Sequence, residues 1–177
     1  MKILLGTFFV LISGFCVFGQ KSVASLKPAH TSALERFLSE NKDYGFMSEN
    51  ALENEYLKEV YKWFKKPIKP YYAVADFNRD KVLDFAVILS RKGESKDLGK
   101  AFSIEHRFEH KLAVVIFNGD KKGGFTKAFI EDVKAPSACF INFEDKQLYF
   151  GVFESDANTM IFKPVGKGYI VKRLKTQ

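Results

Sequence analysis

A run of oxygen-bearing residues between two apolar segments carries the clearest chemistry in this sequence. Residues 76–84 read DFNRDKVLD, so an aspartate or asparagine stands at the first, third, fifth and ninth positions. Calcium takes about six to eight oxygen ligands, and alternate side chains of a tight loop can face one centre together with a backbone carbonyl. We therefore expect a calcium site with five ligands from this loop. They are the side chains of Asp76, Asn78, Asp80 and Asp84 and the carbonyl oxygen of Val82.

The same loop departs from the EF-hand, the helix–loop–helix calcium motif, at two positions. An EF-hand needs a glycine at its sixth position and a bidentate glutamate at its twelfth, between two helices. Here those positions hold Lys81 and Val87, and both flanks have the apolar pattern of strands. The sequence therefore predicts a strand–loop–strand site and excludes an EF-hand.

Residues 71–130 resemble an FG-GAP or VCBS repeat, in which an aspartate-rich loop of the form D-x-N-x-D-G-x-x-D joins two apolar strands. The segment AVADFNRDKVLDFAVIL matches the loop and both strands, and LAVVIFNGDKKGGF is similar to the continuation of such a repeat. The resemblance implies the same five calcium ligands. Repeats of this family usually build propellers of about four to eight blades. This chain is too short for that, so we expect one such hairpin within a compact domain.

Lys81 is the main departure from the family pattern, because the family has glycine at this position. A left-handed backbone there would cost a residue other than glycine on the order of 1 kcal/mol. Arg79 and Lys81 also bring positive charge close to the proposed cation. Both features are expected to weaken calcium binding.

A second motif, HRFEH at residues 106–110, supports an alternative function. It matches the inverted zinc-peptidase pattern, in which two histidines one helical turn apart bind zinc and a glutamate acts as the base. In a zinc-dependent hydrolase His106 and His110 would be the ligands and Glu109 the base. The motif requires a helix, whereas the run KLAVVIF that follows at once predicts a strand. A noncatalytic domain is therefore the first hypothesis and the hydrolase the alternative.

The N-terminus has the pattern of a secretion signal. Lys2 precedes an apolar stretch that ends at Phe18, and the small Gly19 stands before the expected cleavage point. We expect an exported protein, periplasmic or secreted, with no transmembrane segment after cleavage of residues 1–19. A linker at residues 20–30 and one domain at residues 31–177 would follow.

Composition narrows the class of partner. The chain has 28 basic and 21 acidic residues, a net charge of +7, but the excess is spread along the chain without a nucleic-acid-reading motif. We therefore expect an extracytoplasmic protein or glycan as the partner, and no nucleic acid. Cys139 is the one cysteine that would remain after cleavage, and its apolar run ACFINF favours a buried side chain over a nucleophile.

Two helices are expected before the strands. Residues 31–42 predict a short helix with Thr31 as its N-cap, because apolar residues recur on one face. Residues 48–66 predict a longer amphipathic helix that Pro67 ends. Both helices have an apolar face that must pack against another element.

From residue 71 onward, eight short apolar or alternating runs are separated by turn residues. The connections between most of them are too short for crossover helices, which predicts a mostly antiparallel sheet. Two runs, residues 84–90 and 111–117, are apolar on both faces, so we expect central strands that are covered on both sides or covered by the N-terminal helices. The expected fold class is α+β, with N-terminal helices followed by a mostly antiparallel β-meander that contains the calcium hairpin.

Overall fold

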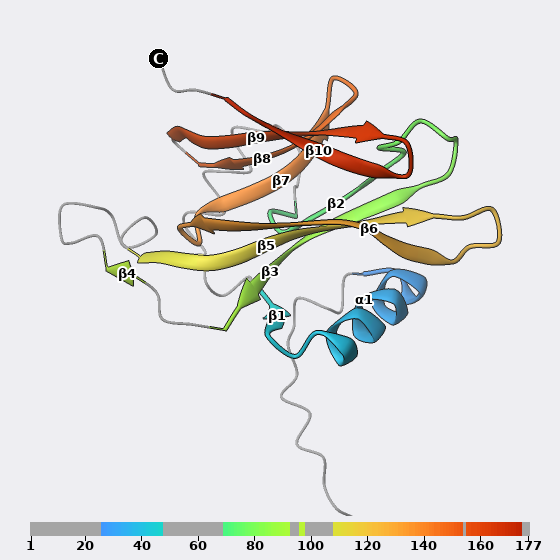
Figure 1. The fold of residues 1–177 in the computed structure, drawn as a ribbon, viewed down its shortest axis with the longest axis horizontal. Coiled ribbons are helices and arrows are strands. Elements are labelled where there is room, and N and C mark those ends of the chain that lie inside the picture. Colours follow the sequence, from blue (N-terminus) through green and yellow to red (C-terminus); the bar gives the residue numbers. More distant parts are fainter. Residues whose placement is uncertain (1–25, 48–68, 93–95, 98–107, 154, 175–177) are drawn as a thin grey trace, which may run out of the picture.

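A computed structural model describes residues 26–47, 69–92, 96–97, 108–153 and 155–174. Within these residues lie one helix and ten strands (Figure 1). The elements are α1 (Pro28–Glu40), β1 (Tyr44–Phe46), β2 (Tyr72–Ala75), β3 (Asp84–Arg91), β4 (Lys96–Asp97), β5 (Phe108–Gly119), β6 (Phe125–Ala135), β7 (Cys139–Glu144), β8 (Gln147–Val152), β9 (Ser155–Val165) and β10 (Gly168–Arg173).

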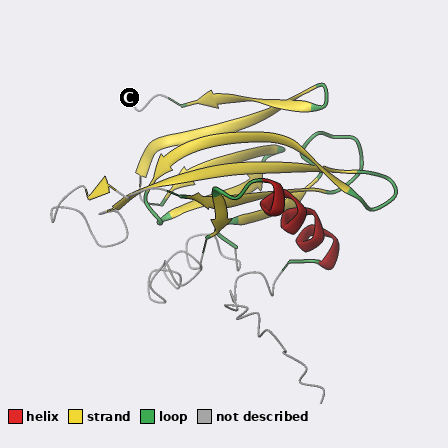
Figure 2. Cartoon of the chain, turned by 60° about the horizontal axis from the view of Figure 1, so that its bottom comes forward, coloured by secondary structure: helices red, strands yellow, loops and turns green. Residues whose placement is uncertain are grey.

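The strands form two antiparallel sheets that face each other, and α1 lies on the outer side of the first sheet (Figures 1 and 2). In the first sheet β5 pairs with β3 and β6, β3 also pairs with β1 and β2, and the short β4 pairs with the start of β5. The second sheet is a meander in the order β10, β9, β8, β7. The described residues therefore form three layers, namely one helix and two sheets.

The α+β fold class expected from the sequence is wrong. The described residues hold a single helix against two antiparallel sheets, so the fold is mostly β. The meander divides after β6, and residues 139–173 fold back to cover the first sheet. Strands that are apolar on both faces need a cover on each side, and a second sheet provides one of them. The predicted helix at residues 48–66 and the predicted signal at residues 1–19 lie outside the described residues.

The helix α1 begins three residues before the predicted helix at residues 31–42. Pro28 occupies its first turn, where the missing N–H of proline leaves no helical hydrogen bond unmade. Thr31 is consequently inside the helix, and its hydroxyl donates to the carbonyl oxygen of Lys27 at 3.3 Å. The predicted linker at residues 20–30 thus ends in helix.

The prediction of central strands covered on both sides is confirmed for β3 and β5. On the outer side, Phe85 and Phe117 stack with ring centroids 4.5 Å apart, and they pack with Leu34 and Phe37 of α1. We call this group the helix-side core. Each large apolar side chain buried in this way contributes roughly 1.5–3 kcal/mol to folding.

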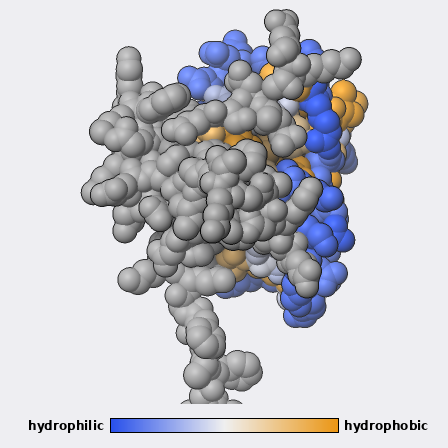
Figure 3. All heavy atoms as spheres, turned by 90° about the vertical axis from the view of Figure 1, so that its left-hand side faces the viewer, coloured by the Kyte–Doolittle hydropathy of each residue, from blue (hydrophilic) through white to orange (hydrophobic). Residues whose placement is uncertain are grey.

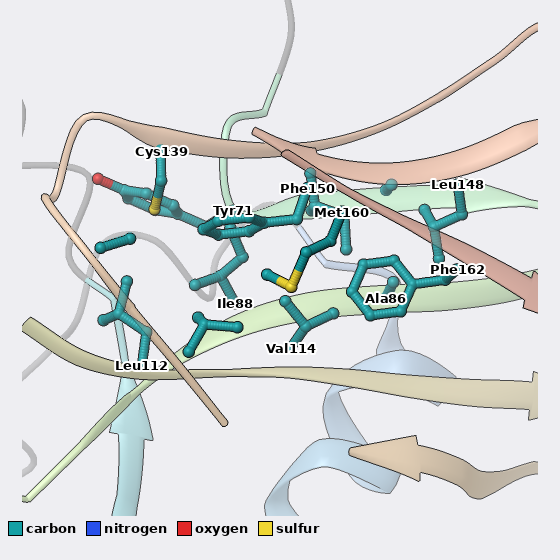
Figure 4. Close-up of a cluster of buried hydrophobic side chains, with 14 of the residues drawn as sticks. Tyr71, Ala86, Ile88, Leu112, Val114, Cys139, Leu148, Phe150, Met160 and Phe162 are labelled. Atoms are coloured by element: carbon teal, nitrogen blue, oxygen red, sulfur yellow. The ribbon is translucent and has the colours of Figure 1, made fainter. Parts of the chain in front are cut away.

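The alternate residues of the same strands form the inter-sheet core. Ile88 and Val114 of the first sheet face Phe150 and Phe162 of the second (Figure 4). Cys139 is fully buried in this core, as predicted, and burial raises the pKa of its thiol. A thiol in such surroundings is a packing group and not a nucleophile.

Candidate metal centre

The predicted calcium loop connects β2 to β3 as a hairpin. The two strands pair antiparallel, and Ala75 opposite Asp84 is the pair next to the loop. The strand–loop–strand arrangement predicted from the sequence is therefore confirmed. Because the flanking strands belong to the first sheet, the loop has a rigid base.

Three of the predicted ligand side chains converge within the loop. The backbone N–H of Asp80 donates to Oδ1 of Asp76 and to Oδ1 of Asn78, at 3.0 Å each. Both oxygens accept from the same nitrogen at 3.0 Å, so the two oxygens lie at most about 6 Å from each other. The Asn78 side-chain amide also donates to Oδ2 of Asp80 at 3.0 Å. Hydrogen bonds within the loop therefore hold these three side chains close together.

Backbone N–H groups further along the loop complete this turn. Lys81 N donates to Oδ2 of Asp76 at 2.9 Å, and Val82 N donates to Oδ1 of Asp80 at 2.8 Å. Such side-chain-to-backbone bonds explain why aspartate and asparagine favour tight turns. A carboxylate has about four acceptor sites, so these bonds leave capacity for a cation on both aspartates.

The backbone of the loop is left-handed at two residues. Lys81 has φ 71°, as its place in the glycine position of the repeat pattern suggested, and Arg79 has φ 65°, which we did not predict. Each of these conformations costs on the order of 1 kcal/mol. The Arg79 guanidinium donates to the carbonyl oxygen of Lys146 in the β7–β8 turn at 3.4 Å, so the loop contacts the second sheet.

Asp84, the fourth predicted side-chain ligand, faces the interior and is 0% exposed. Its Oδ2 accepts the N–H groups of Phe77 at 2.8 Å and Asn78 at 3.2 Å, and its Oδ1 accepts the N–H of Gly119 at 3.0 Å. Burial raises the pKa of Asp84 above its ordinary value, and the three N–H bonds oppose this shift. Asp84 therefore ties the loop to the end of β5.

Gly119 is a residue that sequence reasoning missed. A β-carbon at this position would collide with the carbonyl oxygen of Leu83 and lie 3.0 Å from Cγ1 of Val82. Only glycine lets the end of β5 approach the loop closely enough for its N–H to reach Asp84. The glycine in the NGD turn was the available signal, but by itself it indicates an ordinary hairpin.

Tyr169 of β10 lies on the side of the second sheet that faces the loop. Its hydroxyl donates to Oδ1 of Asn118 at 2.9 Å. Burial raises the pKa of Tyr169, and the negative charges of Asp84, Asp80 and Asp76 raise it further. The loop carboxylates therefore create a negative potential between the sheets that a bound cation would reduce.

The donor chemistry of the loop suits calcium better than a transition metal. In the described part of the chain, no group of three His, Cys, Asp or Glu side chains is arranged to hold a metal ion. Asp84 faces inward, so Asp76 and Asp80 are the two carboxylates that remain within the loop. Such hard oxygen donors fit calcium, which also accepts water ligands and an irregular geometry.

The zinc motif lacks the helix that it requires. Glu109 and His110 lie in the strand β5, where consecutive side chains point to opposite faces of the sheet. His106 lies outside the described residues. The geometry at residues 109 and 110 therefore gives no support to the zinc-dependent hydrolase.

No protein-family model, curated protein or solved structure matches this chain. The likeness to FG-GAP and VCBS repeats therefore rests on the loop and its flanking strands alone. In the described residues, the helix α1 is neither long enough nor apolar enough to cross a membrane.

Proposed function

We propose that this protein is an exported, noncatalytic calcium-binding domain in which the metal orders the β2–β3 loop. Asp76, Asn78 and Asp80 would supply side-chain oxygens, Val82 its carbonyl oxygen, and water the remaining ligands. Asp84 would position the loop from beneath. The observation that carries the proposal is the convergence of Asp76 and Asn78 on one N–H, that of Asp80.

Electrostatics supports a cation at this place. Burial raises the pKa of the Asp84 carboxylate, and the negative charge of Asp80 raises it further. Like charges held together in a fixed loop repel each other, and a divalent cation would replace that repulsion by attraction. The ion would also hold the left-handed residues Arg79 and Lys81 in place.

The metal would have a structural role. The converging oxygens exist only in the folded hairpin, so calcium that binds there adds to the free energy of unfolding. A loop ordered in this way offers a defined surface at the end of both sheets. The partner that we infer for this surface is an extracytoplasmic protein or glycan.

Thermal unfolding in EDTA, in excess calcium and in zinc tests the proposal. At a calcium concentration about one hundred times Kd, stability should rise by about 2.7 kcal/mol. This corresponds to a rise of roughly 5–11 °C in Tm for a domain of this size. Zinc should give no comparable rise, because the loop offers only oxygen donors.

Asp76→Asn and Asp120→Asn form a matched pair for this experiment. Asp120 lies in the β5–β6 turn and, like Asp76, accepts two backbone N–H bonds. Asp76→Asn should remove most of the calcium-dependent rise in Tm, whereas Asp120→Asn should keep it. A wild-type protein whose Tm is the same in EDTA and in calcium would refute the proposed function.

A further inference from the structure

A second candidate site lies on the first sheet, at the ends of β3 and β5 that are remote from the β2–β3 loop. A pocket of about 430 Å³ opens there. Figure 1 shows α1 beneath the opposite end of this sheet, and Figure 3 looks onto the end where β3 stops and β5 begins. Hydrophilic residues, in blue, form much of the visible margin of the described part in that view. The charged residues that line the pocket are Asp43, Arg91, Lys92, Lys111, Asp132 and Lys134.

Strand pairing places the cations of this pocket in one row across the sheet. Tyr44 of β1 pairs with Arg91 of β3, and Lys111 of β5 pairs with Lys134 of β6. Ser90 of β3 pairs with Leu112 of β5, so the next residues along these antiparallel strands, Arg91 and Lys111, lie opposite each other. Residues directly opposite in antiparallel strands share a face, so one aromatic ring and three cations follow each other across four strands.

Arg91 is held in place by its neighbours. Its guanidinium forms an ion pair with Asp132 and lies 5.8 Å from the centroid of the Tyr44 ring. The Tyr44 hydroxyl also donates to Oδ1 of Asp132 at 3.4 Å. The negative charge of Asp132 is therefore offset by Arg91, and the guanidinium is oriented before any ligand arrives.

The two lysines are in the opposite situation. Lys111 and Lys134 stand directly opposite each other, an arrangement of like charges that destabilises a sheet. Among the residues that the structure describes, neither lysine forms an ion pair. Four cations against two carboxylates leave the pocket with a net charge of +2. An anion between the two lysines would turn their repulsion into two charge-assisted hydrogen bonds.

We propose that this pocket binds a tetrahedral oxyanion, a phosphate or sulfate group, between Lys111 and Lys134, with Arg91 and Lys92 beside it. The net charge of +2 favours a dianion over a monocarboxylate. The site is independent of the calcium loop, which lies at the other end of β3 and β5.

Titration of the ¹⁵N-labelled protein with sodium phosphate at pH 8 and constant ionic strength tests the site. Phosphate should produce saturable shifts of the amide signals around Lys111 and Lys134. Sulfate should do the same, and acetate should bind more weakly. If a hexose 6-phosphate binds as tightly as phosphate, the natural ligand carries its phosphate group as an ester. If the hexose 6-phosphate binds more weakly, the natural ligand is the free ion.

Lys111→Gln/Lys134→Gln is compared with Lys121→Gln/Lys122→Gln, which removes the same charge from the opposite end of the β5–β6 hairpin. The first pair should weaken phosphate binding by about tenfold or more, and the second should change it little. Without anion, the first variant should melt at or above the Tm of the wild type, because a like-charge pair is gone. Equal phosphate affinity in the two variants, or shifts that never saturate in the wild type, would overturn the proposal.

Discussion

At the scale of single residues, Asp84 shows how one carboxylate can position a loop. Its two oxygens accept N–H groups from both sides, Oδ2 from Phe77 and Asn78 and Oδ1 from Gly119. A buried N–H without an acceptor costs about 1–3 kcal/mol, and a charged acceptor makes the bond stronger. The three N–H bonds therefore offset part of the cost of burying the Asp84 carboxylate.

Asp84→Asn should lower the free energy of unfolding by about 2–4 kcal/mol. The asparagine amide keeps one acceptor oxygen and replaces the other by an NH₂ group. This NH₂ group then faces either the N–H of Gly119 or the N–H groups of Phe77 and Asn78, which lose their acceptor. Urea unfolding at pH 7 measures the change. Asp120→Asn is the control and should change stability far less than Asp84→Asn, because both N–H bonds of Asp120 go to Oδ1 and the amide oxygen can keep them. Equal stability of the two variants would contradict the role of Asp84.

At the scale of elements, α1 is attached to the first sheet through a buried histidine. His30 is hydrogen-bonded through Nδ1 to the Tyr72 hydroxyl, and its ring stacks on Phe85 with a centroid distance of 4.6 Å. The ring of Phe125 meets it edge-on, also at 4.6 Å. Burial lowers the pKa of His30, and the positive charge of Lys27 lowers it further. The docked helix thus favours the neutral imidazole.

This environment predicts that stability falls as the pH drops below about 6.5, the value for an unfolded histidine. In that range the unfolded chain binds a proton that the folded protein excludes, so the loss continues down to the lowered pKa of the folded state. His30→Phe should keep the ring packing and reduce the loss of stability between pH 7.5 and 5.5. Urea unfolding at both pH values measures it.

His110, whose pKa is also lowered by burial, should contribute to the pH dependence that remains in His30→Phe. An undiminished loss of stability in this variant would show that His30 does not couple α1 docking to pH. Tyr72 does not interfere with the comparison, because its pKa is raised by burial and it stays neutral over this range.

At the scale of the whole molecule, β3 and β5 join the two cores. Alternate residues of both strands enter the helix-side core and the inter-sheet core. A disturbance of one core is therefore transmitted to strands that also support the other. We expect the described layers to unfold in one cooperative transition.

Phe150→Ala should lower the free energy of unfolding by about 3–5 kcal/mol, because it leaves a cavity in the inter-sheet core. Ile170→Ala is the control on the same sheet, since Ile170 is 54% exposed and its removal should cost less than about 1 kcal/mol. Urea unfolding followed by circular dichroism and by tyrosine fluorescence should give coincident transitions in both variants. A Phe150→Ala protein as stable as the control, or two separate transitions, would contradict a shared core.

The sequence by itself determined the strands and the turns between most of them. All eight predicted runs from residue 71 onward are strands, because alternation of apolar residues and turn residues act locally. Asp76, Asn78 and Asp80 meet for the same reason, since two-residue spacing within one turn brings side chains together. The glycine position of the repeat pattern suggested a left-handed backbone at Lys81, which has φ 71°.

Only the tertiary structure decided what covers each face and which way Asp84 points. An apolar strand face has the same sequence pattern whether a helix or a second sheet packs on it. The sequence pattern therefore did not reveal that the meander divides after β6. Asp84 faces inward because the N–H of Gly119, 35 residues further along the chain, lies opposite it. Such a contact depends on strand pairing, whereas the regular spacing of residues 76–84 makes every oxygen in the loop look equivalent.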